Sequence, residues 1–384
     1  MKRLVLSGKN IICGAGSLTA LAELTCRRAT VMTGGNSMLK NGVIDRAVQY
    51  LTEAGAQVQV LTGVRKNPSF EEVDGYLKDV REFRPDCMIA IGGGSAMDCA
   101  KAVVLFYEFS FLTKDNVLDY NATGKIPAMR KTALICIPST SGTGSELTRG
   151  TVITDTQAKL KVPIMTDCLR PDIAILDPEL TMTMPRQVVA ETGLDALTHA
   201  IESYTNHNLD DFDEALASRA ICGLMKWLPV SYREGSLIAR EKVHHYQAMA
   251  GISFANVGLG MVHGIAHAFG AAFDLAHGLT NAIILPYALT YNRRDPVVEE
   301  KLQELSYLCR CEDIVEEIKR MRAELQIPNS YRDAGITEEA YLAQYDLLLE
   351  HSMLGATKVN PVVMTRESMG QMLHAVYYGD EIDF

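Results

Sequence analysis

Short apolar runs alternate with helical patterns through the first half of the chain, and this alternation most strongly limits the folds open to it. Four runs rich in β-branched and aliphatic residues have the length of strands: Ala29–Thr33, Gln57–Leu61, Cys87–Ile91 and Ala133–Pro138. Helical spacing separates the early runs, at Val43–Glu53 and Glu71–Phe83. Such alternation favours a parallel sheet covered by helices. Two further short strands are predicted at Val152–Thr154 and Ile173–Leu176.

The pattern changes near residue 180. From Thr181 onward, long segments such as VVAETGLDALTHAIESYT have apolar residues at helical spacing, and we find no segment that alternates convincingly with a period of two. The sequence therefore predicts an α/β fold class with two domains. The first, over residues 1–180, contains the parallel sheet, and the second, over residues 181–384, is all-helical.

Composition excludes several classes of protein. The chain has 384 residues, 47% of them apolar, and a formal net charge of −10, so it can bury folded cores but offers no basic run to nucleic acid or an anionic membrane. We find no run of about 18 uncharged apolar residues, and the N-terminal MKRLVLSGKN lacks the apolar segment of a secretory signal. Nine cysteines without a CxxC pair indicate reduced thiols, and hence a cytoplasmic protein.

Two glycine-rich turns follow predicted strands. Gly92–Ser95 (GGGS) precedes a helical segment, where glycine lets the backbone approach a ligand and the helix start offers free N–H groups to a pyrophosphate. Pro138–Glu146 (PSTSGTGSE) alternates hydroxyl residues with glycine, and hydroxyls bond phosphate or ribose oxygens. A single GGGS turn is equally compatible with a connection that binds nothing. Two such turns at strand ends favour a dinucleotide site, although neither is a GxGxxG fingerprint or a Walker loop.

A third glycine turn, Thr33–Ser37, bears on the choice of cofactor. An acidic residue at this place usually holds the ribose 2′-hydroxyl of NAD, and none is present here. Gly35 and Ser37 leave room for a 2′-phosphate that Lys40 could face, which favours NADP. A solvated surface charge is an equally good interpretation of Lys40.

Metal-ligand residues gather in the second half. Asp195 and His199 stand four residues apart, as do His263 and His267, and this spacing places each pair on one helix face. His277 follows in LAHGLTNA. A carboxylate and imidazoles suit Fe²⁺ or Zn²⁺, which the sequence does not separate. Five candidates exceed a four-ligand site, so we expect His267 to stay off the metal and to move a proton or support a ligand.

Taken together, these segments closely resemble the iron-containing (group III) alcohol dehydrogenase family, and in particular its butanol-dehydrogenase-like members. The segments that carry the resemblance run in the family's order and cover most of the chain: GGGSAMDCAK, PSTSGTGSE, DPELTMTMP, GLDALTHAIESY, GLGMVHGIAHAFG, HGLTNAIILP and the closing SMGQMLHAVYYG. The NAD-preferring members have an aspartate where this chain has Gly35, which puts a strict preference for NAD in doubt.

The resemblance implies roles for individual residues. Asp195, His199, His263 and His277 would hold a divalent metal, typically Fe²⁺, with His267 near the substrate as a proton relay and Phe254 beside the substrate. The residues that would line the nicotinamide cofactor are Gly94, Ser95, Asp98, Thr140, Ser141, Thr143, Ser145 and Lys161, with Asn67 near its adenosine end. The first domain would thus bind the dinucleotide and the second the metal, with the cleft between them bringing the two together.

The expected activity is interconversion of small primary alcohols and aldehydes by hydride transfer, with NADP or NAD as cofactor. A dimer is the family-level expectation for the oligomeric state. One alternative is a non-redox lyase similar to dehydroquinate synthase on the same architecture. An inactive scaffold would have lost metal ligands, and a metal hydrolase would leave the two glycine turns without a purpose.

Overall fold

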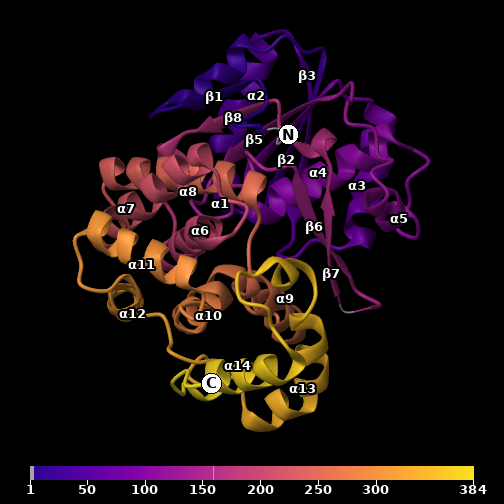
Figure 1. The fold of residues 1–384 in the computed structure, drawn as a ribbon. Coiled ribbons are helices and arrows are strands. Elements are labelled where there is room, and N and C mark those ends of the chain that lie inside the picture. Colours follow the sequence, from indigo (N-terminus) through magenta and orange to yellow (C-terminus); the bar gives the residue numbers. More distant parts are fainter. Residues whose placement is uncertain (1–3, 159) are drawn as a thin grey trace. The chain divides into compact units, whose positions relative to one another are not determined.

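The computed structural model describes residues 4–158 and 160–384, and the chain forms two compact units, residues 1–183 and 184–384 (Figure 1). The first unit contains every strand of the described residues. These strands are β1 (Asn10–Cys13), β2 (Arg28–Gly34), β3 (Gln57–Val64), β4 (Cys87–Gly92), β5 (Ala133–Pro138), β6 (Gly150–Asp155), β7 (Leu160–Met165) and β8 (Ile173–Leu176).

Six strands form one parallel sheet in the order β1-β8-β5-β4-β2-β3. The chain passes from β2 outward to β3 and then returns to β4 on the other side of β2, so the strand order reverses between β2 and β4. Ligands of open α/β sheets bind at the carboxyl ends of the strands beside such a reversal. Because all six strands are parallel, the turns that follow β2, β4 and β5 lie at one edge of the sheet, which is where the three glycine-rich turns are.

The four main strands and the parallel sheet are confirmed, whereas two strands were not predicted. β1 is only four residues long and mostly exposed, and β7 contains Pro163, so neither has a clear strand pattern. The segment Val152–Thr154 lies in β6, which pairs with β7 as a separate antiparallel ribbon and not in the main sheet.

Helices cover the sheet of the first unit. They are α1 (Ser37–Lys40), α2 (Val43–Glu53), α3 (Phe70–Phe83), α4 (Gly94–Glu108) and α5 (Val117–Ala122), with short 3₁₀ turns at Ser17–Glu23, Asp167–Leu169 and Pro178–Thr181. α3 begins at a serine N-cap, where Ser69 Oγ accepts a hydrogen bond from the Glu72 amide. α4 starts at Gly94, the last glycine of the GGGS turn, and is buried along most of its length.

Residues 184–384, all of which the structure describes, form helices and their connections, and the expected all-helical character of this part is confirmed. The helices are α6 (Arg186–Thr205), α7 (Asp211–Glu234), α8 (Leu237–Val257), α9 (Met261–Phe273), α10 (His277–Asn292), α11 (Pro296–Cys309), α12 (Ile314–Glu324), α13 (Glu338–Ser352) and α14 (Arg366–Tyr378), with a 3₁₀ turn at Gly355–Val359. Their apolar faces share one core, to which α6, α9 and α10 contribute heavily.

Among the described residues, no single helix has the length and apolar character needed to cross a membrane. α8 and α9 meet that test only as a pair, and the pair is bent by 103°.

A buried lysine holds the hydroxyl-rich turn in place. The Lys101 side chain on α4 has no exposed surface, and its Nζ donates to the backbone carbonyls of Ser145 at 2.6 Å, Thr148 at 3.0 Å and Gly150 at 2.8 Å. The Ser145 and Thr148 hydroxyl oxygens lie at 3.0 and 3.3 Å from the same nitrogen. Burial lowers the Lys101 pKa, and the ring of acceptors compensates the ammonium for its lost water.

Replacing this lysine is expected to destabilise the first unit. Lys101→Met keeps the length of the side chain but removes the donor that three carbonyls share, two of them buried, which should lower the free energy of unfolding by roughly 3 kcal/mol. Urea denaturation followed by circular dichroism measures the loss. Lys78→Met, at an exposed position of α3, is the control and should change stability by less than about 0.5 kcal/mol. Equal effects of the two substitutions would contradict the role given to Lys101.

Candidate functional site

Three helices of the second unit bring the predicted metal ligands together. Asp195 and His199 lie one turn apart in the middle of α6, His263 lies in the first turn of α9, and His277 is the first residue of α10. Asp195, His199 and His263 are buried, and His277 is half-buried. Four polar side chains from distant parts of the sequence therefore share one place in an otherwise apolar core.

One oxygen atom is the common point of this cluster. The Asp195 Oδ1 atom lies 3.9 Å from His199 Nε2, 3.9 Å from His263 Nε2 and 3.8 Å from His277 Nε2. Ligand atoms that each lie about 2.1 Å from one ion are at most about 4.2 Å apart, so each imidazole can share an ion with Asp195. Ligand atoms of Asp195, His263 and His277 all lie within 4.8 Å of one another, and His199 is the more peripheral member.

The Asn281 amide marks where these atoms converge. Its Nδ2 donates to Asp195 Oδ1 at 2.6 Å and lies 3.2 Å from His263 Nε2 and 3.1 Å from His277 Nε2. The carboxylate oxygen and the two imidazole nitrogens thus surround the Asn281 amide nitrogen, whose hydrogens carry a partial positive charge. Asn281 stands four residues after His277 on α10, a spacing that sequence reasoning did not use.

Burial makes this cluster electrostatically demanding. Desolvation raises the pKa of Asp195 to about 6, although the nearby His263 and the Asn281 hydrogen bond lower it in part. A carboxylate that has lost its water is stabilised by a cation, and a divalent ion bound to Asp195 would supply one. The donor set of one carboxylate and three imidazoles is the type that Fe²⁺ and Zn²⁺ prefer.

Glu202 supports the cluster and was missed in the sequence. Its Oε2 lies 2.5 Å from His263 Nδ1, and its Oε1 accepts the backbone N–H of Val262 at 2.8 Å. The same carboxylate therefore orients the His263 ring and caps the start of α9, which leaves Nε2 of His263 facing Asp195. The signal was its position, seven residues after Asp195 and three after His199, on the same face of α6.

His267 and Phe254 lie beside the cluster. The His267 ring stacks on His277 with centroids 5.1 Å apart, and it meets the His263 ring edge-on at 6.2 Å. Phe254, on α8, stacks on His199 at 4.3 Å. His267 is half-buried and lies outside the group of mutually close ligand atoms, an arrangement that suits the proton-relay role predicted for it.

In the first unit, the two glycine turns after β4 and β5 lie side by side. Gly92 is paired with Pro138, and the Gly92 carbonyl accepts the Ser139 amide at 2.9 Å. A Cβ built on Gly94 would lie only 2.7 Å from Thr143 Cγ2, and one on Gly93 would lie 3.4 Å from Thr140 Oγ1. Glycine is thus required at Gly94, the first residue of α4, because the hydroxyl-rich turn approaches it so closely.

Several of the predicted cofactor residues form one connected group. Ser145 Oγ donates to Asp98 Oδ1 at 3.2 Å, and the Ser145 amide donates to Thr143 Oγ1 at 3.3 Å. Desolvation raises the pKa of Asp98 to about 6, against the opposing charges of Lys101 and, more weakly, Lys161. Ser95 is in the first turn of α4, Thr140 is half-buried, and Ser141 is buried in the turn.

The remaining cofactor candidates lie farther along the sheet edge. Gly35 follows β2 with a φ of 59°, and a Cβ there would meet open space. Ser37 begins the short helix α1, and Lys40, its last residue, is exposed. Asn67 also has a positive φ, of 53°, and its carbonyl accepts the Thr154 hydroxyl at 3.2 Å, which ties the loop before α3 to β6.

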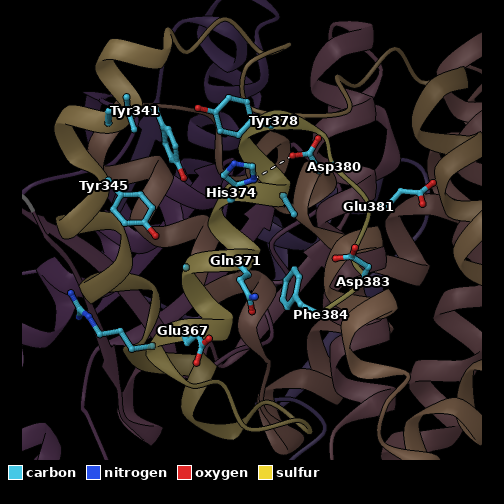
Figure 2. Close-up of a pocket in the computed structure, with 14 residues that line it drawn as sticks. Tyr341, Tyr345, Glu367, Gln371, His374, Tyr378, Asp380, Glu381, Asp383 and Phe384 are labelled. Carbon is cyan, nitrogen blue, oxygen red and sulfur yellow. Dashed lines mark ion pairs between the residues drawn. The ribbon is translucent and has the colours of Figure 1, made fainter.

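A groove of about 860 Å³ near the C-terminus lies apart from these residues. Figure 2 shows that aromatic rings such as Tyr341, Tyr345 and Phe384 share it with carboxylates, and that Asp380 pairs with His374 at 3.3 Å. None of the predicted metal or cofactor residues lines it. The groove is therefore not the candidate site.

Comparison with known proteins identifies the relationship that the geometry suggests. A model described as iron-containing alcohol dehydrogenase matches residues 8–178, and a model of the C-terminal part of the Fe-containing alcohol dehydrogenase family matches residues 189–377. The chain belongs to the iron-containing alcohol dehydrogenase family. Both units of this alcohol dehydrogenase are covered by the match, and the resemblance stated from its sequence motifs is confirmed.

Individual relatives align with nearly the whole length of this chain. The NADPH-dependent butanol dehydrogenase of Clostridium saccharobutylicum is 38% identical, with 98% of each chain aligned, and an alcohol dehydrogenase of Thermococcus barophilus is 35% identical over 96% of this chain and 97% of its own. The solved iron-containing alcohol dehydrogenase of Thermococcus thioreducens is 33% identical and superposes with a TM-score of 0.91 over 99% of this chain and 100% of its own. The protein is thus an oxidoreductase of the α/β-plus-helical fold predicted, and the lyase alternative has no support among these relatives.

Removing the charge of Glu202 is expected to weaken metal binding. Glu202→Gln keeps the shape of the side chain but exchanges a carboxylate for an amide opposite His263 Nδ1, so the ring loses the partner that fixes its orientation and basicity. The affinity for Fe²⁺ or Zn²⁺, measured by competition with a chelator, should fall about 10- to 100-fold.

Glu304→Gln is the matched control. Glu304 accepts the Tyr204 hydroxyl of α6 at 2.7 Å and is not one of the cluster's contacts, so its substitution should leave the affinity within about twofold. Unchanged metal affinity in Glu202→Gln would contradict the role of Glu202 in orienting His263 for metal binding.

Proposed function

We propose that this chain catalyses the reversible, NAD(P)H-dependent interconversion of small primary alcohols and aldehydes, with one divalent metal ion held by Asp195, His199, His263 and His277. The observation that carries the proposal is the approach of three imidazole nitrogens to one carboxylate oxygen at 3.8–3.9 Å. The family and its similarity to named alcohol dehydrogenases support the same reaction class.

For the metal we propose Fe²⁺, with Zn²⁺ as the ion that the same donors also accept. The site offers one carboxylate oxygen and three imidazole nitrogens without a thiolate, which suits both ions. The description of the family as iron-containing favours Fe²⁺. Glu202 would keep His263 in the tautomer whose Nε2 faces the ion.

The cofactor would lie along the turns at the carboxyl edge of the sheet. Gly94 and Ser95 offer the backbone N–H groups of the α4 start to the pyrophosphate, and hydroxyls of the Pro138–Glu146 turn supply further contacts. We propose NADP as the preferred form, because Gly35 places no carboxylate at the end of β2 and leaves open space there. The butanol dehydrogenase relative is itself described as NADPH-dependent.

The chain's own residues hold and position the reactants. When bound, the metal supplies Lewis acidity and the nicotinamide supplies or accepts hydride. His267 would pass the alcohol proton between the site and solvent, since it lies beside the cluster and is half-exposed. Phe254, stacked on His199, would form an apolar wall against the carbon chain of the substrate.

We further propose that the enzyme acts in the cytoplasm as a homo-oligomer, with a dimer as its simplest form. Its nine free cysteines are compatible with a reducing compartment. The oligomeric state follows from the family resemblance alone, and sedimentation of the purified enzyme tests it.

Substitution of a single histidine tests the proposed function. His263→Ala removes a nitrogen from the centre of the cluster, so we expect loss of bound metal and at least a 100-fold drop in turnover, which corresponds to a rise of about 2.7 kcal/mol in the activation free energy. Circular dichroism should still show a folded chain. Turnover is measured on a panel of small aldehydes with NADH and NADPH in parallel, after Fe²⁺ or Zn²⁺ is added back.

His374→Ala, at an exposed position of α14, is the control and should retain both metal and activity. Full turnover of metal-depleted His263→Ala would overturn the proposal, and so would a wild-type enzyme that consumes substrate without any net change in nicotinamide absorbance.

A second substitution tests the cofactor preference. Gly35→Asp places a carboxylate at the end of β2, where it would repel a 2′-phosphate and accept a ribose 2′-hydroxyl. The ratio of kcat/KM with NADPH to that with NADH should fall at least about tenfold, which corresponds to about 1.4 kcal/mol. Gly35→Asn is the uncharged control: asparagine has the size of aspartate and also tolerates a positive φ, so this variant should change the ratio less. If Gly35→Asp leaves the NADPH-to-NADH ratio of kcat/KM unchanged, the adenosine ribose of the cofactor does not lie at the end of β2.

A further inference from the structure

Two cysteines of the helical unit face each other away from the metal cluster. Cys222 lies on α7, and Cys309 is the last residue of α11, 87 positions later in the chain. Their Sγ atoms are 3.3 Å apart, and both side chains are half-buried. A disulfide bond is about 2.05 Å long, so the two sulfurs need to approach by roughly 1.3 Å to bond.

The pair lines a basic pocket of about 700 Å³. Its charged lining residues are Arg219, Lys226, Arg310, Arg320, Glu312 and Glu317. Arg219 and Lys226 stand three residues before and four after Cys222, and therefore on the same face of α7. Since Arg320 pairs with Glu317, the remaining charge around the sulfurs is positive.

The two thiols differ in their chemistry. Hydrogen bonding with Cys309 and then the charge of Arg219 lower the pKa of Cys222 to about 7, against the effect of burial. Hydrogen bonding with Cys222 and burial raise the pKa of Cys309. Because Arg219 and Lys226 also flank it on the same face of α7, we take Cys222 as the nucleophile and Cys309 as the thiol that follows it. A third cysteine in the pocket, Cys311, instead directs its thiol to the Ser306 carbonyl at 3.7 Å.

We propose that Cys222 and Cys309 form a redox-active dithiol, and that the basic pocket around them binds a carboxylate-bearing, low-molecular-weight disulfide that oxidises the pair to an intramolecular disulfide. The site lies within the second unit, and none of its lining residues belongs to the metal cluster. Its chemistry is independent of the alcohol dehydrogenase reaction proposed above.

The exchange takes place in two balanced steps. The Cys222 thiolate attacks one sulfur of the small disulfide RS–SR, forms a Cys222–S–SR bond and releases RS⁻, which takes up a proton. Cys309 then loses its proton, and its sulfur attacks the Cys222 sulfur and expels the second RS⁻. Two protein thiols lose two electrons to one small disulfide, which becomes two thiols.

The proposed disulfide formation is tested on the metal-loaded, 384-residue enzyme in the absence of oxygen and peroxide. It is incubated with oxidised glutathione, quenched with acid, alkylated, and analysed by intact mass and peptide mapping. We expect each chain to carry two alkyl groups fewer than the reduced control, with the two unalkylated sulfurs mapped to a Cys222–Cys309 bond. Disulfides that instead join other cysteines, or a Cys222 that stays fully alkylated, would overturn the proposal.

Single substitutions separate the roles of the thiols. Cys222→Ser should abolish reaction at this site, and Cys309→Ser should stop at one glutathionyl group on Cys222. Cys311→Ser changes a thiol of the same pocket and should react as the unsubstituted enzyme does. A Cys309→Ser variant that carries no adduct on Cys222, or a Cys311→Ser variant that fails to form the bond, would contradict the assigned roles.

Disulfides of opposite charge test whether the basic pocket prefers an anionic ligand. Cystamine, a cationic disulfide, should form the same bond about tenfold more slowly than oxidised glutathione at equal concentration and low salt, and high salt should shrink this difference. Equal or faster reaction with cystamine would overturn the assignment of an anionic ligand.

Discussion

The helical unit is organised around polar side chains that an apolar core does not ordinarily accept. Asp195 has lost nearly all of its water, and three imidazoles approach it from α6, α9 and α10. Burial of such groups is costly unless they are hydrogen-bonded or share a cation. The positions of these three helices are therefore tied to the cluster, since a shift of any of them would leave a buried polar group without a partner.

Each unit uses a buried charged side chain to shape a region with a candidate role in binding. In the helical unit, Glu202 caps α9 and holds His263 with one carboxylate. In the α/β unit, Lys101 donates to two carbonyls of the segment between β5 and β6 and to the carbonyl of Gly150, the first residue of β6, while Gly94 lets the same segment approach α4. In both places a buried charge bonds to backbone groups, at the start of α9 in the helical unit and at the turn that leads into β6 in the α/β unit. The dithiol of Cys222 and Cys309 lies outside this organisation and links α7 to the end of α11.

Sequence reasoning reached the fold and most of the site for identifiable reasons. The strand runs at β2, β4 and β5 are short and apolar because inner parallel strands are buried on both faces, whereas β3 stands at the sheet edge and is mostly exposed. The pair Asp195 and His199 was visible because helical periodicity is local. Glu202 continues the same face of α6 and was within reach of the same argument. Asn281 and Lys101 were not, because an amide or a lysine in a helix is usually solvent-exposed and only packing reveals its acceptors.

The sequence by itself determined the alternation of the main strands with helices, the change to an all-helical second half, the glycine turns after the strands, and the residue types able to bind a metal. These properties follow from periodicity and backbone conformation, which act over a few residues. Only the tertiary structure decided which atoms meet: that three imidazoles share one oxygen of Asp195, that Thr143 closes on Gly94, and that Cys222 faces Cys309. Such contacts join residues up to 87 positions apart, and they arise from the packing of whole helices, which local sequence patterns do not encode.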